Sequence, residues 1–303
     1  MRVLFMGTPE IAAVCLKRLA LEHEIVGVFC QPDKPVGRKA VVTPPPVKLA
    51  ALERGIEVFQ PLKLRDGEAE KTIERLAPEL IAVVAYGRIL PKEILEIPRW
   101  GCVNIHASLL PKYRGAAPIQ RALMNGESET GVCSMYMGEG LDTGDIIASK
   151  SCPIEDGDDA VSMFEKLGAL GAQLLCETVS DIEKGSAAAT PQNDEEASLA
   201  PPLQKSEGAF SWQDSARDIF NKARALCIWP NACFEYEGKT VKLLKARFSP
   251  LEGKAGEVLS LQPLTVAAKG GAVQLLEVKP EGSRLMTGKE WAAGRRLKAG
   301  DFI

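Results

Sequence analysis

The amino-acid sequence predicts an α/β protein in which a Rossmann-like, mostly parallel sheet forms the N-terminal domain and an OB-like β-barrel forms the C-terminal domain. Three observations support this prediction. Apolar runs alternate with helix-like segments over the first half of the 303-residue chain, which is typical of a parallel sheet covered by helices. The composition then shifts to Ala, Pro, Ser and acidic residues, as in a linker. Short strand-like runs separated by Gly-containing turns follow, as in small barrels.

The N-terminal domain begins with an apolar run, residues 3–6, that stops at Gly7-Thr8-Pro9. Pro9 suits the first turn of a helix, and the 3.6-residue periodicity of residues 11–21 predicts that helix. The later runs are apolar on both faces, as strands of a buried parallel sheet are. Strands are expected at residues 24–30, 58–60, 80–85, 101–106 and 131–137, and helices at residues 49–54, 69–77, 119–124 and 160–182.

Residues 189–205 are the expected linker between a domain of residues 1–188 and a C-terminal domain of residues 206–303. The C-terminal domain is predicted to begin with a helix, and Glu237-Gly238 is typical of a tight hairpin turn between two of its strands. The helix is expected at residues 215–225, and the strands at residues 232–237, 240–248, 256–261, 264–268 and 272–278.

Composition excludes several classes of protein. No apolar run reaches the roughly 18–20 residues of a membrane helix, and the short apolar N-terminus does not resemble a signal peptide. Eight cysteines include no Cys-x-x-Cys pair, and only two histidines are present, so a metal site has few candidate ligands. The cysteines are interpreted as reduced core residues, without an obvious activating neighbour for a catalytic thiol. We therefore expect a cytoplasmic protein with no metal and no membrane association.

The charge is distributed unevenly along the chain. Residues 204–303 carry 16 Lys and Arg against 11 Asp and Glu, a net charge of +5. Residues 1–203 carry 21 against 29, a net charge of −8. A basic C-terminal part is consistent with a polyanionic partner, although five charges on a hundred residues are also an ordinary solvated surface.

The first candidate site lies at the end of an expected strand, Cys102-Val103-Asn104-Ile105-His106. Side chains alternate along a strand, so Asn104 and His106 point to the same side at its C-terminal end, where ligands bind in open α/β sheets. An amide can donate to an oxyanion, and an imidazole can handle protons, as acyl transfer to an amine requires. A hydrogen-bonded polar pair of the core would give the same pattern.

Two loops follow that pair. Residues 108–118 form a loop punctuated by Pro and Gly that combines basic and aromatic side chains. Residues 138–145 contain three glycines and the carboxylates of Asp142 and Asp145, so the backbone can approach a ligand closely. A calcium loop is the alternative for this segment, but the terminal Glu and the full set of ligands are missing.

These segments resemble a known family. The Asn-x-His pair, the stretch Ser108-Leu109-Leu110-Pro111-Lys112-Tyr113-Arg114-Gly115-Ala116-Ala117-Pro118 and the loop Leu141-Asp142-Thr143-Gly144-Asp145 together look like the folate-dependent formyltransferases. Phe5-Met6-Gly7-Thr8-Pro9, Gln31-Pro32-Asp33-Lys34-Pro35, Gly37-Arg38 and Trp229-Pro230-Asn231-Ala232 resemble the branch of that family that formylates initiator Met-tRNA. The resemblance covers essentially the whole chain.

The resemblance implies 10-formyltetrahydrofolate as the formyl donor, with no need for a metal or for NAD. Asn104 and His106 are then expected to stabilise the tetrahedral oxyanion, while Asp142 orients His106 and relays a proton. The residues implied to line the reduced-folate pocket are Tyr86, Gly87, Ser108, Leu109, Leu110, Pro111, Gly140 and Leu141. We expect the protein to be a monomer.

The resemblance also implies that the loop of residues 31–48 grips the acceptor end of the tRNA, through phosphates and in a salt-dependent way. Arg38 is the implied key contact, with Lys34 and Lys39 beside it. In bacterial relatives the arginine precedes a Gly and more lysines, whereas here the run is Arg38-Lys39-Ala40-Val41-Val42-Thr43, which lowers the loop's charge. Further contacts are expected from Lys242 and Lys245, which alternate with apolar residues along a hairpin.

Three alternatives remain open at this point. Formyl transfer to a small amine, such as a sugar nucleotide or glycinamide ribotide, would use the same catalytic trio, but the basic C-terminal part argues against it. A dinucleotide-binding dehydrogenase is disfavoured because the first turn, Met6-Gly7-Thr8-Pro9-Glu10, lacks Gly-x-Gly-x-x-Gly and places Glu10 where a pyrophosphate would bind. A non-catalytic tRNA-binding protein would be expected to have lost one of the three catalytic residues.

Overall fold

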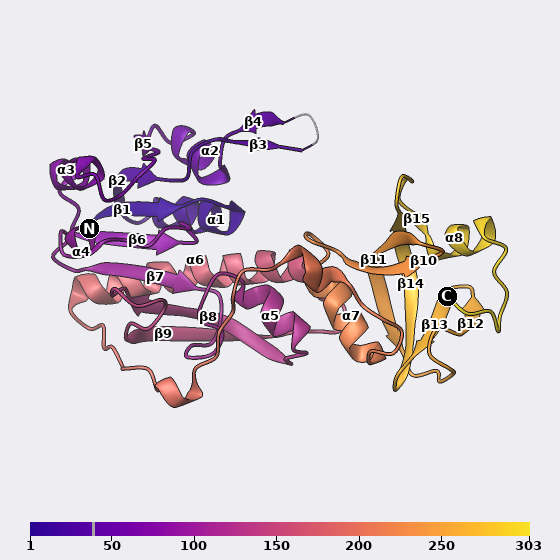
Figure 1. Ribbon diagram of the computed structural model, residues 1–303. Helices are drawn as coiled ribbons and strands as arrows, with labels where there is room; N and C mark the ends of the chain where they lie inside the picture. The colour runs from indigo at the N-terminus through magenta and orange to yellow at the C-terminus, as the bar shows by residue number, and fades with distance from the viewer. Residues whose placement is uncertain (38–39) are drawn as a thin grey trace. The chain divides into compact units, whose positions relative to one another are not determined.

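The structure is a computed structural model that describes residues 1–37 and 40–303, and Figure 1 shows its helices and strands. The described residues form two compact units. Unit 1 comprises Met1–Pro118, Glu129–Cys152 and Phe164–Pro201, and unit 2 comprises Ile119–Ser128, Pro153–Met163 and Pro202–Ile303. Two short segments from the predicted N-terminal domain, residues 1–188, therefore belong to the same unit as the C-terminal part.

Unit 1 contains a seven-stranded sheet in the order β5-β2-β1-β6-β7-β8-β9. The five strands from β5 to β7 pair in parallel, and β7 and β8 are antiparallel. The predicted mostly parallel sheet is confirmed. The bounds are β1 (Arg2–Gly7), β2 (Glu24–Phe29), β5 (Val58–Phe59), β6 (Leu80–Val84), β7 (Cys102–His106), β8 (Glu129–Tyr136) and β9 (Ile146–Pro153).

Helices and a small hairpin connect these strands, and the long α6 is the clearest helix of the region in Figure 1. Every residue of β6 and β7 is buried, which agrees with a sheet covered on both faces. The hairpin β3–β4, helix α4 and edge strand β9 were not predicted; β3, β4 and α4 have only three or four residues each, and β9 mixes apolar and polar residues. The bounds are α1 (Glu10–Leu19), β3 (Lys34–Val36), β4 (Val41–Thr43), α2 (Pro46–Leu52), α3 (Glu68–Leu76), α4 (Lys92–Leu95), α5 (Pro118–Met124) and α6 (Ala160–Lys184).

The order of strands in unit 1 reverses between β1 and β6. The chain runs outward from β1 through β2 to β5, and then returns to β6 on the other side of β1. Ligands of open α/β sheets bind at the carboxyl ends of strands next to such a switch point. Gly7 ends β1 beside Val84, and a Cβ added at Gly7 would lie 2.8 Å from the Val84 carbonyl oxygen. Only glycine therefore fits where the strands meet at the ligand edge.

Unit 2 contains an antiparallel sheet in the order β10-β11-β14-β13-β12, with β15 paired to β14. Within the described residues β10 and β12 are not paired to each other, so the sheet is barrel-like without being closed. The predicted strands of the C-terminal part are confirmed, and the expected helix is α7 (Ala216–Ala225). The bounds are β10 (Ala232–Tyr236), β11 (Lys239–Ser249), β12 (Val258–Leu261), β13 (Leu264–Ala268), β14 (Gly271–Pro280), β15 (Met286–Thr287) and α8 (Gly288–Gly294).

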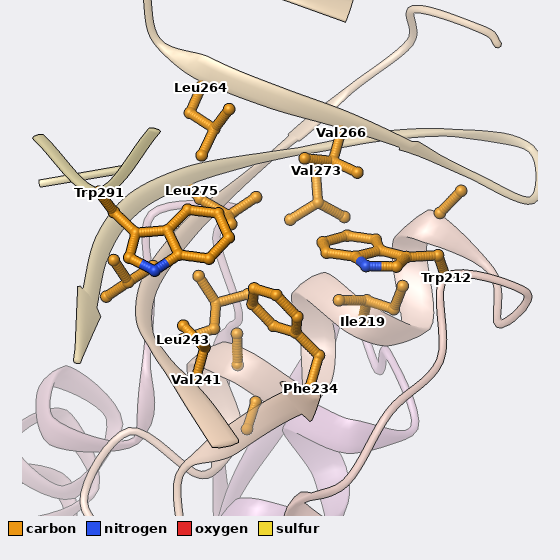
Figure 2. Close-up of a cluster of buried hydrophobic side chains, with 14 of the residues drawn as sticks. Trp212, Ile219, Phe234, Val241, Leu243, Leu264, Val266, Val273, Leu275 and Trp291 are labelled. Carbon is orange, nitrogen blue, oxygen red and sulfur yellow. The ribbon is translucent and has the colours of Figure 1, made fainter. Parts of the chain in front are cut away.

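An aromatic cluster forms the core of unit 2, as Figure 2 shows. The ring of Phe234 lies between two tryptophans, with ring centroids 5.2 Å from Trp212 and 5.8 Å from Trp291. Valine and leucine side chains of β11, β13 and β14 surround these rings. Because aromatic side chains dominate the burial of a small core, this cluster anchors the sheet against α7 and α8.

Candidate active site

His106 and Asn104 lie at the carboxyl end of β7, beside the end of β6. Both side chains are more than nine-tenths buried. Nε2 of His106 lies 2.8 Å from the carbonyl oxygen of Tyr113, and a carbonyl can only accept, so Nε2 carries the proton. The other ring nitrogen, Nδ1, faces Oδ2 of Asp142 at 3.6 Å.

Asp142 is the second charged group of the site. Its backbone adopts a left-handed conformation with a φ of 53°, which few residues other than glycine adopt. Its Oδ2 accepts a 2.8 Å hydrogen bond from the backbone N–H of Gly115, which lies in the loop that follows β7. The loops of residues 108–118 and 138–145 therefore meet at the carboxylate. The structure brings Asp142 to His106, and Asn104 lies two residues before His106 on the same strand.

The amide of Asn104 is available to a ligand. No hydrogen-bond partner of its side chain lies among the described residues, although the side chain is only 8% exposed. Buried amides in native structures are normally satisfied, so an open one next to His106 marks a place where a ligand oxygen can bind. A polar pair that only stabilises the core would have its hydrogen bonds filled.

The residues expected to line a folate pocket differ in how they are placed. Ser108 is fully buried, and its hydroxyl donates a 2.7 Å hydrogen bond to the Lys112 carbonyl, so it shapes its own loop. Leu110 packs on Cys133 and Met135. Leu109 and Pro111 are half-buried in the same loop, and on the second loop Gly140 is exposed and the side chain of Leu141 is 59% exposed.

Tyr86 and Gly87 follow β6. The Tyr86 ring packs into the core of unit 1 and its hydroxyl has no partner among the described residues, so only its backbone can face a ligand. Burial raises the pKa of Tyr86 to about 12, which keeps the phenol neutral. Its carbonyl accepts hydrogen bonds from Thr8 Oγ1 and Gln31 Nε2, both at 3.2 Å. The start of the loop of residues 31–48 is thus tied to the ligand edge.

The basic residues of that loop are not equally free. Nζ of Lys48 lies 2.9 Å from both carboxylate oxygens of Asp33 and 2.8 Å from Oε1 of Gln60. Hydrogen bonds from Gln60 and Lys48 hold the pKa of Asp33 below its ordinary value. Lys48 is therefore not a free positive charge of this loop. Lys34 is exposed on β3, whereas Arg38 and Lys39 lie outside the described residues.

In unit 2, Lys242 and Lys245 share one face of the sheet, but simple alternation does not explain it. Residues three apart on a regular strand point to opposite faces. A register shift between Leu243 and Lys245 inserts one extra residue in β11, so that Lys242 pairs with Lys279 and Lys245 pairs with Glu277 of β14. Because Glu277 and Lys279 are two residues apart, they and the two lysines lie on one face of the sheet. Lys245 is exposed, whereas Nζ of Lys242 donates a 3.0 Å bond to Asn231 Oδ1.

Sequence reasoning missed Gln192, and it assigned no contact to Arg114 of the loop of residues 108–118. The Gln192 amide donates to the carbonyl oxygens of Asp142 and Gly144 at 2.9 and 2.7 Å, and its oxygen accepts from Arg114. The Arg114 guanidinium is buried and also donates to Asp194 at 2.8 Å. Gln192 lies in the segment interpreted as a linker, where composition gives no signal of a side-chain contact 50 residues away.

An open groove of about 700 Å³ occupies another part of unit 1. Most of its polar lining is acidic, which disfavours both phosphates and the carboxylates of a folate. No group of His, Cys, Asp and Glu residues suited to a metal occurs among the described residues, and no described helix has the length and apolarity to cross a bilayer. The groove is lined by Glu70, Glu74, Ala77, Pro78, Glu79, Glu93, Glu96, Ile97 and Arg99.

Solved structures share this fold. An N-formyltransferase from Helicobacter canadensis, in complex with folinic acid and dTDP-3-aminofucose, gives a TM-score of 0.69 at 19% identity over 89% of this chain and 97% of that one. HypX from Aquifex aeolicus in complex with tetrahydrofolic acid gives 0.66 at 22% identity over 100% of this chain. The match covers 49% of HypX, so this chain spans about half the length of that protein.

Sequence comparison identifies the family. Residues 1–179 match the formyl transferase family, and residues 202–296 match the formyl transferase C-terminal domain. The chain is 45% identical to the methionyl-tRNA formyltransferase of Caldicellulosiruptor saccharolyticus, covering 100% of both proteins, and 44% identical to that of Pelotomaculum thermopropionicum, covering 100% of this chain and 95% of the relative. The chain therefore belongs to the methionyl-tRNA formyltransferase family.

Proposed function

We propose that this enzyme transfers the formyl group of 10-formyltetrahydrofolate to the α-amino group of methionine on initiator Met-tRNA, for translation initiation. The observation that carries the proposal is the unpartnered amide of Asn104 beside a histidine whose Nε2 is fixed by the Tyr113 carbonyl. The substrates are inferred from the family, because relatives that match the full length of this chain are named methionyl-tRNA formyltransferase.

The proposed chemistry begins with attack of the amine nitrogen on the formyl carbon. The carbonyl electron pair moves onto oxygen, and the Asn104 amide and His106 stabilise the oxyanion that forms. Donors aimed at such an oxygen contribute about 2.7–4 kcal/mol to lowering the barrier. Collapse of the tetrahedral species breaks the bond between the carbon and N10 of the folate, and N10 takes up the proton that the amine lost.

Asp142 supports both steps in this scheme. It faces Nδ1 of His106, the ring nitrogen that does not contact the Tyr113 carbonyl, and it is held by the Gly115 N–H. A carboxylate in that place orients the imidazole and can pass the amine's proton through water towards N10. The folate is proposed to lie along the loops of residues 108–111 and 140–141 and the backbone at Tyr86 and Gly87.

The tRNA is proposed to bind through the loop of residues 31–48 and the sheet of unit 2. Arg38, Lys39 and Lys34 would contact the acceptor end, and Lys242 and Lys245, on one face of β11, would contact phosphates. We further propose that the sheet of unit 2 works as an OB-like barrel, that residues 1–188, 189–205 and 206–303 are the functional parts, and that the enzyme acts as a cytoplasmic monomer.

The test is a comparison of acceptors. Purified enzyme is given 10-formyltetrahydrofolate with initiator Met-tRNA, free methionine or an amino-sugar nucleotide, and formylated product is measured for each. Product on the tRNA alone is expected. Product on the small amine, or loss of the formyl group without formylated tRNA, would overturn the assigned acceptor. Arg38→Ala is expected to weaken tRNA binding; a defect confined to folate affinity would refute the loop's assignment.

A further inference from the structure

Residues 190–200, named the strap here, pair with the loop that follows His106 and with the end of the loop that carries Asp142. Thr190 and Ile146 exchange two backbone hydrogen bonds of 2.9 Å at the end of the loop of residues 138–145. At the other loop, Arg114 N–H donates to the Ser198 carbonyl at 2.8 Å, and Ala200 N–H donates to the Arg114 carbonyl at 2.7 Å. The strap therefore holds together two loops that lie far apart in sequence.

The side chain of Gln192 completes this connection. Both hydrogens of its amide are used, on the carbonyl oxygens of Asp142 and Gly144, at 2.9 and 2.7 Å. Both lone pairs of its oxygen are also used, by Nε and Nη2 of Arg114 at 3.0 and 2.8 Å. A glutamine side chain has no further capacity for strong hydrogen bonds. This full use fixes its orientation.

The positions of these bonds relate Gln192 to catalysis. Asp142 is held in a left-handed conformation that costs roughly 1–2 kcal/mol for a residue with a Cβ and persists only where its surroundings fix it. Gln192 binds the carbonyl of that residue and of Gly144, two positions later. On the other side, it binds Arg114, whose neighbours Tyr113 and Gly115 contact His106 and Asp142.

We infer that Gln192 is a positioning residue that holds the Asp142 carboxylate in register with His106. The expected fall in kcat rests on the proposed function, whereas the expected effect on the loop of residues 140–145 does not. Arg114 serves the same end, because its buried guanidinium needs the Gln192 oxygen as a partner, and the exposed carboxylate of Asp194 completes its pairing.

Gln192→Glu tests the inference with a side chain of the same shape. A carboxylate cannot donate to the carbonyls of Asp142 and Gly144, but it keeps and strengthens the contact with Arg114. We expect kcat to fall about 10- to 100-fold, as a misplacement of about 1 Å can do, while the KM values for folate and tRNA stay close to those of the wild type. A second readout is backbone hydrogen exchange in the loop of residues 140–145, which should accelerate.

Asn193→Asp is the matched control, since it makes the same change of amide to carboxylate one residue away. Asn193 Oδ1 caps a short turn by accepting from Glu195 N–H, which an aspartate also does. The variant loses only the exposed 3.1 Å bond from Asn193 Nδ2 to Glu196 Oε1, which touches neither catalytic group, so activity and exchange should remain those of the wild type. If Gln192→Glu fails to fold, Gln192→Met removes the bonds to the Asp142 and Gly144 carbonyls without adding charge, and removes the two bonds from Arg114 as well.

The outcomes are distinct. If the wild-type protein forms no formylated tRNA, the proposed function is wrong. Hydrogen exchange in the loop of residues 140–145 would still show whether Gln192 holds that loop in place. An active wild type with unchanged kcat and unchanged exchange in the Gln192 variants refutes the inference. A rise in KM alone also refutes it, because Gln192 would then contact substrate, and a fall in melting temperature with normal kcat would show a purely structural role.

Discussion

Substitution of Asn104 by Ala separates catalysis from folding more cleanly than any other change at this site. The side chain makes no hydrogen bond within the described residues, so its removal breaks no internal bond and leaves no partner unsatisfied. The free energy of unfolding should change by about 1 kcal/mol or less, a shift in melting temperature of under about 4 °C. Loss of an oxyanion donor should lower kcat about 100- to 1000-fold.

The assay is the initial rate of formyl transfer to initiator Met-tRNA at saturating folate, alongside thermal unfolding of the same preparation. Asn221→Ala is the matched control, because Asn221 is equally buried but accepts a 3.1 Å hydrogen bond from Nε of Arg224. That variant should lose about 1.5–3 kcal/mol of stability, since a bond to a charged group is broken, and keep its kcat. A kcat for Asn104→Ala within about fivefold of wild type would refute its assignment to the oxyanion, whose donors contribute far more.

Three further predictions concern tRNA binding, thiols and pH. Lys245→Ala should reduce the slope of log affinity for tRNA against log salt concentration by up to about one. An unchanged slope would show that Lys245 does not contact the tRNA. Burial raises the pKa of Cys30 and Cys133 to about 11, so iodoacetamide at pH 7.5 should leave activity intact, and rapid inactivation would contradict a reaction without a catalytic thiol. Burial, together with the Met1 amino group, lowers the pKa of His23 from its ordinary value of 6.5. The neutral imidazole therefore contributes its full stabilisation above pH 6.5, and this stabilisation is lost as pH falls below that value. His23→Gln should reduce the pH dependence of the free energy of unfolding between about pH 7.5 and 5.

Much of the fold could be predicted because local pattern and tertiary environment agree. The apolar runs of β6 and β7 are buried on both faces, and their punctuation by Gly and Pro marks the strand ends. The position of Asn104 and His106 on one side of β7 follows from the alternation of side chains along a strand. Contacts between side chains far apart in sequence could not be predicted this way, because neither periodicity nor composition records which glutamine meets which carbonyl.

The same limit applies to two observations about charge. Lys48 counts as a basic residue of its loop in the sequence, but Asp33 and Gln60 occupy its ammonium group in the structure. The spacing of Lys242 and Lys245 would place them on opposite faces, and only the irregular register of β11 against β14 puts them on one. Both outcomes depend on tertiary pairing, which a single sequence does not reveal.

The strap has a consequence for the exchange of parts between related enzymes. A chimera joined at residue 188 would take Gln192 from one parent and Asp142 and Arg114 from the other, and would so divide a set of hydrogen bonds that fitted one another in each parent. A junction after Pro201 keeps that set intact, because unit 1 continues to that residue. For the same reason, a chimera made to change acceptor specificity should take residues 190–200 from the parent that supplies the loops of residues 108–118 and 138–145, and not from the parent that supplies the C-terminal part.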